Sequence, residues 1–342
     1  MDNENRSLKI AVVGAGAVGG ICAAMIAKAG YDVQVVVRRE EQAVAIKEKG
    51  IRVTGIKGEV IVPVDAVCGA GAMAEDRDLV LLGVKATALA EAAQLIEDRI
   101  SSQTMVVSLQ NGFCEDFLGS ILGRERVIGC VTGWGATMHG DRDFEMTSTG
   151  DFIIGNIDNQ PDPRLGKVRE VLNHVLETKI SNNITGSLYS KLIINSCITS
   201  VGALCGLYLG QMLARKQARL IFLAVMEEAM AVAAAMELQV EVFAGKLDYY
   251  TFCGNKGWLS NIKRHAFLRI LGFKYRRLKS SSLQSLERGQ RTEIDYLTGY
   301  ITAKGAEYGV PTPVNDQIQD MVHAIEQKTL TISPENIKRI HL

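Results

Sequence analysis

The sequence is poor in proline and lacks paired cysteines. It has six prolines in 342 residues, and its seven cysteines include no C-x-x-C pair. An odd number of scattered cysteines argues against a disulfide framework and a zinc site, so we expect no metal and a reducing, cytoplasmic compartment. The polar and charged start, Met1 to Lys9, also predicts no signal peptide.

The sequence also lacks net charge, because 38 Lys and Arg residues balance 38 Asp and Glu residues. A chain without excess charge has no general attraction to nucleic acid, so we expect no nucleic-acid partner. A hydrophobic content of 47% with 33 glycines suits a helix-rich α/β protein and excludes a disordered one.

One long stretch, Leu192 to Ala214, lacks charge altogether and has the length of a membrane span. It is interrupted by polar side chains and by three glycines. Buried helices of soluble proteins have this composition too, so we expect no transmembrane span.

The first half of the chain has the pattern of an open α/β sheet. Two apolar runs, Leu8 to Val13 and Asp32 to Val37, flank a glycine-rich turn and a small-residue helix from Gly20 to Ala29. Strand, glycine turn, helix and strand open a doubly wound Rossmann-type sheet. Further strand-like runs are Leu79 to Val84, Thr104 to Leu109, Val127 to Thr132 and Phe152 to Gly155.

The second half changes to helical periodicity from Thr185 onward. We therefore predict a dinucleotide-binding domain over residues 1–183 and an all-α substrate domain over 184–342. The expected helices are Ser187 to Asn195, Leu213 to Met236, Leu286 to Tyr308 and Pro313 to Lys328, whereas Phe243 to Ser282 fits no simple helix.

The glycine turn predicts a dinucleotide site. In a G-x-G-x-x-G turn the first glycine permits the turn, the second lets the backbone approach a pyrophosphate, and the third allows helix–strand packing. The helix amino-terminus then stabilises the phosphate charge. The expected cofactor-binding residues here are Gly14, Ala15, Gly16, Ala17, Val18 and Gly19.

The end of the second strand indicates which dinucleotide binds. NAD enzymes usually place an acid there for the ribose 2′-hydroxyl, whereas this chain has Arg38 followed by Arg39 and Glu40. A guanidinium pairs well with a 2′-phosphate, so we predict NADP as the cofactor. Glu40 argues against this prediction, because an acidic residue at this strand end is typical of NAD enzymes.

Two further strands end in polar residues. Lys85 follows the strand from Leu79, and Asn111 follows the strand from Thr104. Ligands of open α/β sheets bind at the carboxyl ends of strands, which favours a shared cleft. The alternatives are a lysine reaching solvent and an asparagine that merely caps a turn.

In the second half, Lys191 and Asn195 are four residues apart on one expected helix and therefore share a face. Downstream lie a serine-rich segment from Ser280, the run Thr292 to Asp295, and the run Gly309 to Asn315. Taken in order with the glycine turn, Lys85 and Asn111, these segments resemble the ketopantoate reductase family over nearly the whole chain.

The resemblance implies the reduction of a 2-oxo acid, a small-molecule substrate, by NADPH. It implies that Lys191 is the general acid, that Asn111 contacts cofactor and substrate, and that Asn195 and Ser281 hold the substrate. Glu293 would close the site around substrate and cofactor, and Ala136 would line the cofactor. A homodimer is among the assemblies that stay open.

The chain departs from the family pattern at three polar positions on the substrate side. Thr199 and Leu209 stand where the family has asparagines, and so does Leu278, three residues before Ser281. Leucines cannot satisfy the hydroxyl of ketopantoate, so the substrate could be a more apolar 2-oxo acid.

A basic segment, residues 256–279, resembles an insertion for this family and contains no acidic residue. A solvated loop, a lid over an anionic substrate, and a surface for an acidic partner or lipid headgroup remain open. The rival functions are a different hydroxyacid or opine-type dehydrogenase and a non-catalytic NADP sensor with the same fold.

Overall fold

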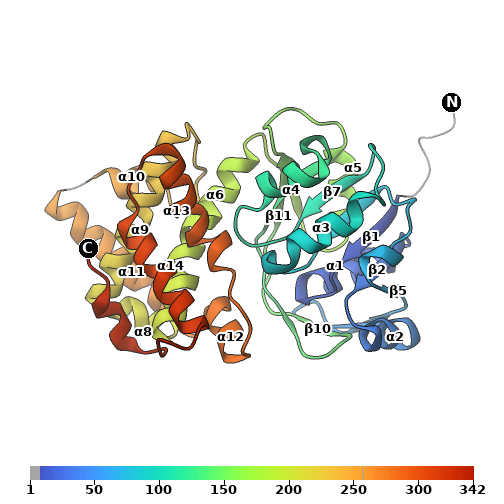
Figure 1. The fold of residues 1–342 in the computed structure, drawn as a ribbon, viewed down its shortest axis with the longest axis horizontal. Coiled ribbons are helices and arrows are strands. Elements are labelled where there is room, and N and C mark those ends of the chain that lie inside the picture. Colours follow the sequence, from blue (N-terminus) through green and yellow to red (C-terminus); the bar gives the residue numbers. More distant parts are fainter. Residues whose placement is uncertain (1–7, 256) are drawn as a thin grey trace. The chain divides into compact units, whose positions relative to one another are not determined.

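The structure is a computed structural model that describes residues 8–255 and 257–342 (Figure 1). Most of the charged start considered above, and Lys256 of the basic segment, therefore lie outside the described residues. The chain divides into two compact units, of which the first ends at Thr185 and the second begins at Gly186.

An eight-stranded, mostly parallel sheet forms the centre of the first unit. Its central strands are buried runs of mostly β-branched and aliphatic residues, as expected for a sheet covered on both faces. In spatial order they are β12 (Thr178–Ile180), β11 (Phe152–Asn156), β8 (Val127–Thr132), β7 (Met105–Ser108), β6 (Leu79–Leu82), β1 (Lys9–Val13), β2 (Asp32–Val37) and β5 (Asp65–Cys68).

The order of the parallel strands is that of a Rossmann sheet. From β5 through β2, β1, β6 and β7 to β8 the chain follows the 3-2-1-4-5-6 pattern, with β1 and β6 paired at the centre. Strand order reverses between β1 and β6, and dinucleotides bind at this reversal point in such sheets. The fold class expected from the sequence is confirmed.

A second, four-stranded sheet was not anticipated. It comprises β4 (Val60–Val62), β3 (Ile51–Gly55), β10 (Asp143–Met146) and β9 (Ala136–Met138) in that order and packs against α1 (Ala17–Lys28). The other helices of the first unit are α2 (Glu40–Lys49), α3 (Leu89–Glu97), α4 (Glu115–Leu122) and α5 (Leu165–Asn173).

The described part of the second unit consists of helices and connecting loops with one isolated bridge, between Phe243 and Leu247 (Figure 1). Its helices are α6 (Ile184–Asn195), a π-helical turn (Ser196–Ser200), α7 (Val201–Cys205), α8 (Leu209–Ala214), α9 (Lys216–Ala235), α10 (Tyr249–Gly254), α11 (Trp258–Lys274), α12 (Ser281–Glu287), α13 (Thr298–Tyr308) and α14 (Pro313–Glu326).

The uncharged stretch belongs to one continuous helical run, Ile184 to Cys205, followed by α8. The run is long and apolar enough to cross a membrane, but 83% of its most apolar window is buried inside the structure. It has the character of a core helix of a soluble protein.

Two expected helices are interrupted. The one expected from Leu213 to Met236 breaks at Arg215, which is extended, and the Arg219 guanidinium donates to the last carbonyls of α8, Leu213 O at 2.7 Å and Ala214 O at 2.8 Å. The one expected from Leu286 to Tyr308 breaks at Gly289, whose φ of +66° ends α12.

The expectation that Phe243 to Ser282 forms no simple helix is wrong. The segment contains α10 and the 17-residue helix α11, so the basic segment is largely helical rather than a solvated loop. Its periodicity is hidden because α11 buries Arg264 and exposes Trp258, Ile270 and Phe273, which inverts the usual hydrophobic pattern.

Candidate active site

The glycine turn sits at the reversal point of the sheet. Gly14 has a φ of +97°, and a Cβ atom added to it would lie 2.7 Å from the backbone nitrogen of Val84. A Cβ atom on Gly19 would lie 2.1 Å from the Gly14 carbonyl oxygen. Both positions therefore require glycine for the turn itself and for the approach of α1 to the loop after β6.

Gly16 is different, because the protein does not crowd it. The nearest atom to an added Cβ would be the Gly83 carbonyl oxygen, at 3.6 Å. Gly16 is the N-cap of α1, and no side chain caps it among the described residues. The space and the amide groups at this helix start fit the pyrophosphate of a dinucleotide, which a side chain at Gly16 would obstruct.

Gln42, which the sequence reading missed, holds this turn from α2. Its side-chain amide donates to Ala15 O at 3.0 Å and to Asp141 O at 2.9 Å. The buried glutamine thereby ties the glycine turn to the β9–β10 connection. A lone glutamine in a helix carries no sequence signal for such a role.

Arg38 follows β2 and is exposed, and its guanidinium forms no ion pair with a described residue. The neighbouring Arg39 is instead paired with Asp141. Glu40 faces Cys68: burial first, and then the Glu40 carboxylate, raise the pKa of that thiol. Of the three charged residues at this strand end, Arg38 is the one available to a 2′-phosphate.

Lys85 and Asn111 follow neighbouring strands, because β6 pairs with β7. Gln110 joins the two ends directly: its side-chain amide donates to Leu82 O at 2.7 Å and to Val84 O at 3.0 Å. Gln110 is thus structural, while Lys85 is exposed and Asn111 half-buried. The first unit brings both residues to the same sheet edge as the glycine turn.

Glu115 is a buried carboxyl group, four residues after Asn111, that the sequence reading also missed. It begins α4 and accepts from the Cys114 backbone N–H at 2.9 Å. Burial raises its pKa to about 7, although hydrogen bonds from the backbone and from Ser108 oppose the shift. The loop that carries Asn111 is therefore anchored on a group that changes charge near neutral pH.

This anchor predicts a pH dependence of stability. A carboxyl whose folded pKa is raised stabilises the fold below its unfolded value of 4.5 and loses that contribution as the pH rises through about 7. Glu115→Gln keeps the hydrogen-bond acceptor without the charge. At pH values above about 7, the free energy of unfolding of this variant should therefore exceed that of the native protein by a few kcal/mol. Urea unfolding of both proteins across the range measures this, and a difference independent of pH would contradict it.

Ala136 begins β9 and pairs with Met146 in the small sheet beside α1. It is half-buried and packs on the hydrophobic core of the first unit. The structure thus places Ala136 in the small sheet that packs against α1, the helix that follows the glycine turn.

In the second unit, Lys191 and Asn195 lie one turn apart on α6 and both are half-buried. The π-helical turn starts immediately after Asn195. Such turns occur often at functional sites, because they shift the helical register and redirect side chains. The turn is fixed by a buried 2.7 Å hydrogen bond between Ser200 and Thr298, at the start of α13.

Ser281 is the first residue of α12, which packs against α7 and the π-helical turn. Its neighbour Ser280 is the buried N-cap, accepting from the Leu283 backbone N–H at 3.0 Å, and Ser281 itself is exposed. The cap therefore fixes the helix start while Ser281 stays accessible.

The two leucines that replace expected amides are also close together. The Leu209 backbone N–H donates to Leu278 O at 3.0 Å. Leu209 is 1% exposed, whereas Leu278 is 39% exposed. Of the two, only Leu278 is accessible without a change of side-chain position.

Glu293 is half-buried between two residues that are firmly anchored to α14. Thr292 donates through both its backbone N–H and its hydroxyl to Glu326, each at 2.7 Å. The Asp295 carboxylate accepts from Gln319 at 2.9 Å and contacts His323 at 2.8 Å. Thr292 and Asp295, which flank Glu293 in the sequence, therefore fix its backbone against α14.

The expected site residues therefore form two groups. Asn111 lies with the cofactor residues in the first unit, and Lys191, Asn195, Ser281 and Glu293 lie in the second. Within residues 8–255 and 257–342, no cluster of three or more His, Cys, Asp and Glu side chains is arranged to hold a metal.

Models of one protein family match both parts of the chain. The family model described as ketopantoate reductase PanE/ApbA matches residues 10–159, and its C-terminal counterpart matches residues 183–326. The chain is 28% identical over 323 residues to 2-dehydropantoate 2-reductase of Archaeoglobus fulgidus, covering 94% of this chain and 99% of that one. It is 29% identical to the Pyrococcus abyssi enzyme of the same name, over 90% of this chain and 94% of that one.

Solved structures of known proteins also resemble this chain. A PanE/ApbA family ketopantoate reductase from Ralstonia eutropha superposes with a TM-score of 0.80 at 28% identity, covering 94% of this chain and 99% of that one. D-mandelate dehydrogenase, solved with NADH and anilino(oxo)acetate, has the same fold, with a TM-score of 0.78 at 24% identity and the same coverage. The chain belongs to the ketopantoate reductase family of nicotinamide-dependent oxidoreductases that act on a CH–OH group.

Proposed function

We propose that this protein uses NADPH to reduce a 2-oxo acid to the 2-hydroxy acid, with Lys191 as the general acid. The main support is the position of Lys191 and Asn195. Both are half-buried, they lie one turn apart on α6, and a π-helical turn follows directly. A cation and an amide on one helix face suit a carbonyl oxygen that gains negative charge.

When bound, the nicotinamide supplies the hydride that the ketone carbon receives. Lys191 donates a proton to the oxygen as the hydride reaches the ketone carbon. Asn195 and Ser281 donate hydrogen bonds to the substrate. Glu293, whose position is fixed by Thr292 and Asp295, stabilises the positive charge of Lys191 in the site.

The first unit would hold the dinucleotide at its sheet edge. The residues Gly14 to Gly19 would hold the pyrophosphate at the start of α1, and Lys85 and Asn111, which follow β6 and β7, would bind the dinucleotide from the same sheet edge. Ala136 would line the same side. The open space at Gly16 supports this arrangement, because nothing in the protein itself requires a glycine there.

The choice of NADPH rests on Arg38 and predicts a selective loss. Arg38→Ala should weaken NADPH binding by about 1–3 kcal/mol and barely change NADH binding, because only NADPH carries the 2′-phosphate. Fluorescence titration with both dinucleotides measures this. Arg39→Ala is the matched control, since its guanidinium is engaged by Asp141. Equal Kd values for both dinucleotides in the native protein would contradict the assignment.

The substrate is ketopantoate or a related 2-oxo acid, and we favour one whose side chain is more apolar. Leu278, which is exposed and whose carbonyl accepts from the Leu209 backbone N–H, supports this, because it offers apolar surface where an amide is expected. We also place the activity in the cytoplasm. All seven cysteines are free thiols and six are buried, as suits a reducing compartment.

An NADPH-oxidation assay over 2-oxo acids of graded size and polarity tests the proposal. Turnover of at least one such acid is expected. Binding of NADPH without reduction of any of them would assign the protein to the non-catalytic sensors instead.

A further inference from the structure

One face of α11 exposes large apolar side chains that no described residue covers. Trp258 is 72% exposed, Ile270 68% and Phe273 73%, and Leu259 and Ile262 are also exposed. At 100° per residue these five positions fall within about a third of the helix circumference. We call this face the α11 surface. Soluble proteins rarely leave so continuous an apolar stripe in water.

Cations border the stripe. Lys263 and Lys274 lie along one edge of the stripe, Arg269 lies within it close to the opposite edge, and Arg276 and Arg277 follow the end of the helix. All five are exposed, and none forms an ion pair with a described residue. The sequence from Tyr249 to Leu286 contains no acidic residue. The surface is thus strongly basic in a chain without net charge.

The opposite face of α11 is fixed, so the stripe cannot turn inward. Arg264 is buried and donates to the Glu227 carboxylate of α9 at 2.7 Å. Gly272 packs so closely on α8 that an added Cβ would lie 2.7 Å from Cβ of Leu213. The orientation of the exposed face therefore follows from the packing of α11 on α8 and from the Arg264–Glu227 ion pair with α9.

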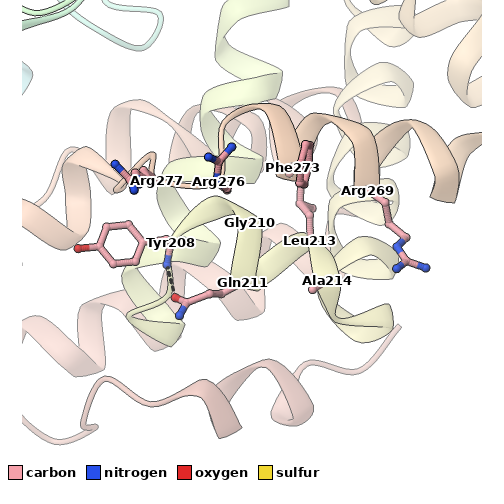
Figure 2. A pocket seen from close by; sticks show the side chains of 10 residues that line it. Tyr208, Gly210, Gln211, Leu213, Ala214, Arg269, Phe273, Arg276 and Arg277 are labelled. Carbon is pink, nitrogen blue, oxygen red and sulfur yellow. Dashed lines mark hydrogen bonds between the residues drawn. The ribbon is translucent and has the colours of Figure 1, made fainter.

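An open pocket of about 810 Å³ lies between α8 and α11, beside the stripe. Its arginines stand at two ends, with Arg276 and Arg277 toward Tyr208 and Arg269 toward Ala214, and Phe273 lies between them (Figure 2). Guanidinium groups beside apolar and aromatic walls fit a phosphate that is attached to a hydrophobic moiety.

We propose that the α11 surface docks on a bilayer that contains anionic phospholipid. An interfacial helix buries an apolar stripe at the level of the acyl chains and places flanking Lys and Arg side chains among the headgroups. The stripe, its basic borders and the arginine pocket match that environment on one rigid face.

A second copy of the chain fits this surface less well. In a two-fold dimer the same patch meets itself, which would place the five unpaired cations of each copy opposite those of the other. An acidic soluble protein would neutralise the charge, but the bilayer alone offers both anionic headgroups and an apolar layer beneath them.

Trp258 provides a direct test, because the chain has only two tryptophans and the other, Trp134, is buried. Full-length protein is mixed with vesicles of equal parts phosphatidylcholine and phosphatidylglycerol, and with pure phosphatidylcholine vesicles. Sedimentation with the anionic vesicles alone is expected, with a blue shift of Trp258 emission. Added salt should weaken the binding.

Two variants separate charge from apolar contact. Arg269→Gln with Arg276→Gln and Arg277→Gln should weaken vesicle binding about a hundredfold, at roughly fivefold per cation. Ile270→Ser with Phe273→Ser should remove the blue shift and weaken binding more than tenfold. Ile61→Ser, at a comparably exposed isoleucine of β4, is the matched control and should bind normally. Circular dichroism and Tm confirm that each variant folds.

Three results would overturn the proposal. The first is no binding to anionic vesicles, including the case of binding to poly-glutamate instead, which would assign the surface to an acidic protein. The second is vesicle binding that both variants leave unchanged. The third is a native dimer in sedimentation equilibrium that the Ile270 and Phe273 changes dissociate, which would mean that a second copy covers the stripe.

Discussion

Replacing Lys191 with alanine is expected to lower turnover by a factor of about 10²–10⁴, the usual cost of losing a positioned general acid. NADPH binding should stay nearly intact, because the glycine turn, Arg38, Lys85 and Asn111 belong to the first unit and Lys191 to the second. Steady-state turnover together with a separate NADPH titration measures both effects.

The matched control is Lys338→Ala. Lys338 is an exposed lysine of the same unit, paired with Glu335 at 2.6 Å, and its loss should leave turnover unchanged. If the Lys191 variant kept more than about a tenth of native activity, Lys191 would not be the proton donor.

The second large effect concerns substrate choice. If Leu209 and Leu278 line the substrate pocket, a 2-oxo acid with a larger apolar group gains roughly 0.8 kcal/mol per buried methylene. Ketopantoate would leave its hydroxyl unpaired and lose about 1–3 kcal/mol. Together these terms make ketopantoate poorer than the preferred substrate by about two orders of magnitude in kcat/KM.

Reversion of both leucines to asparagine should narrow that gap, because it restores hydrogen-bonding groups. Leu278→Asn changes an exposed position and should fold normally, whereas Leu209→Asn buries an amide and should lower the Tm. The single Leu278 variant is therefore compared first, and the double variant is judged against its own Tm. A kcat/KM of the native protein for ketopantoate above about 10⁴ M⁻¹s⁻¹ would contradict an apolar preference.

The parts of the fold that the sequence predicted are those with a local signal. β1, the glycine turn, α1 and β2 follow one another directly, so their pattern is complete between Lys9 and Val37. The small sheet was missed, because its central pair joins β3 to β10, which are some ninety residues apart and only four or five residues long. Such pairing leaves no local pattern.

The helices that the sequence predicted wrongly are those whose existence or limits depend on tertiary packing. α11 was missed, because its exposed face carries the apolar residues and its buried face carries Arg264. The division of α8 from α9 depends on Arg219, whose guanidinium replaces the missing backbone donors at the end of α8. A long apolar run does not reveal where a distant side chain ends a helix.

The candidate site divides in the same way. Glycines at a turn and a lysine one helical turn from an asparagine are short-range patterns, so both could be picked out from the sequence. Gln42, Gln110 and Glu115, by contrast, act on residues of other elements or from a buried position. The anchoring of Thr292 and Asp295 to α14 likewise became clear only from the hydrogen bonds.

The most direct test of the central claim is NADPH oxidation by the purified native protein across a series of 2-oxo acids, from ketopantoate to larger apolar members. The account predicts that at least one apolar member is reduced with kcat/KM above about 10⁴ M⁻¹s⁻¹, and that this activity is lost with Lys191→Ala. NADPH binding with no oxidation by any member of the series would contradict it.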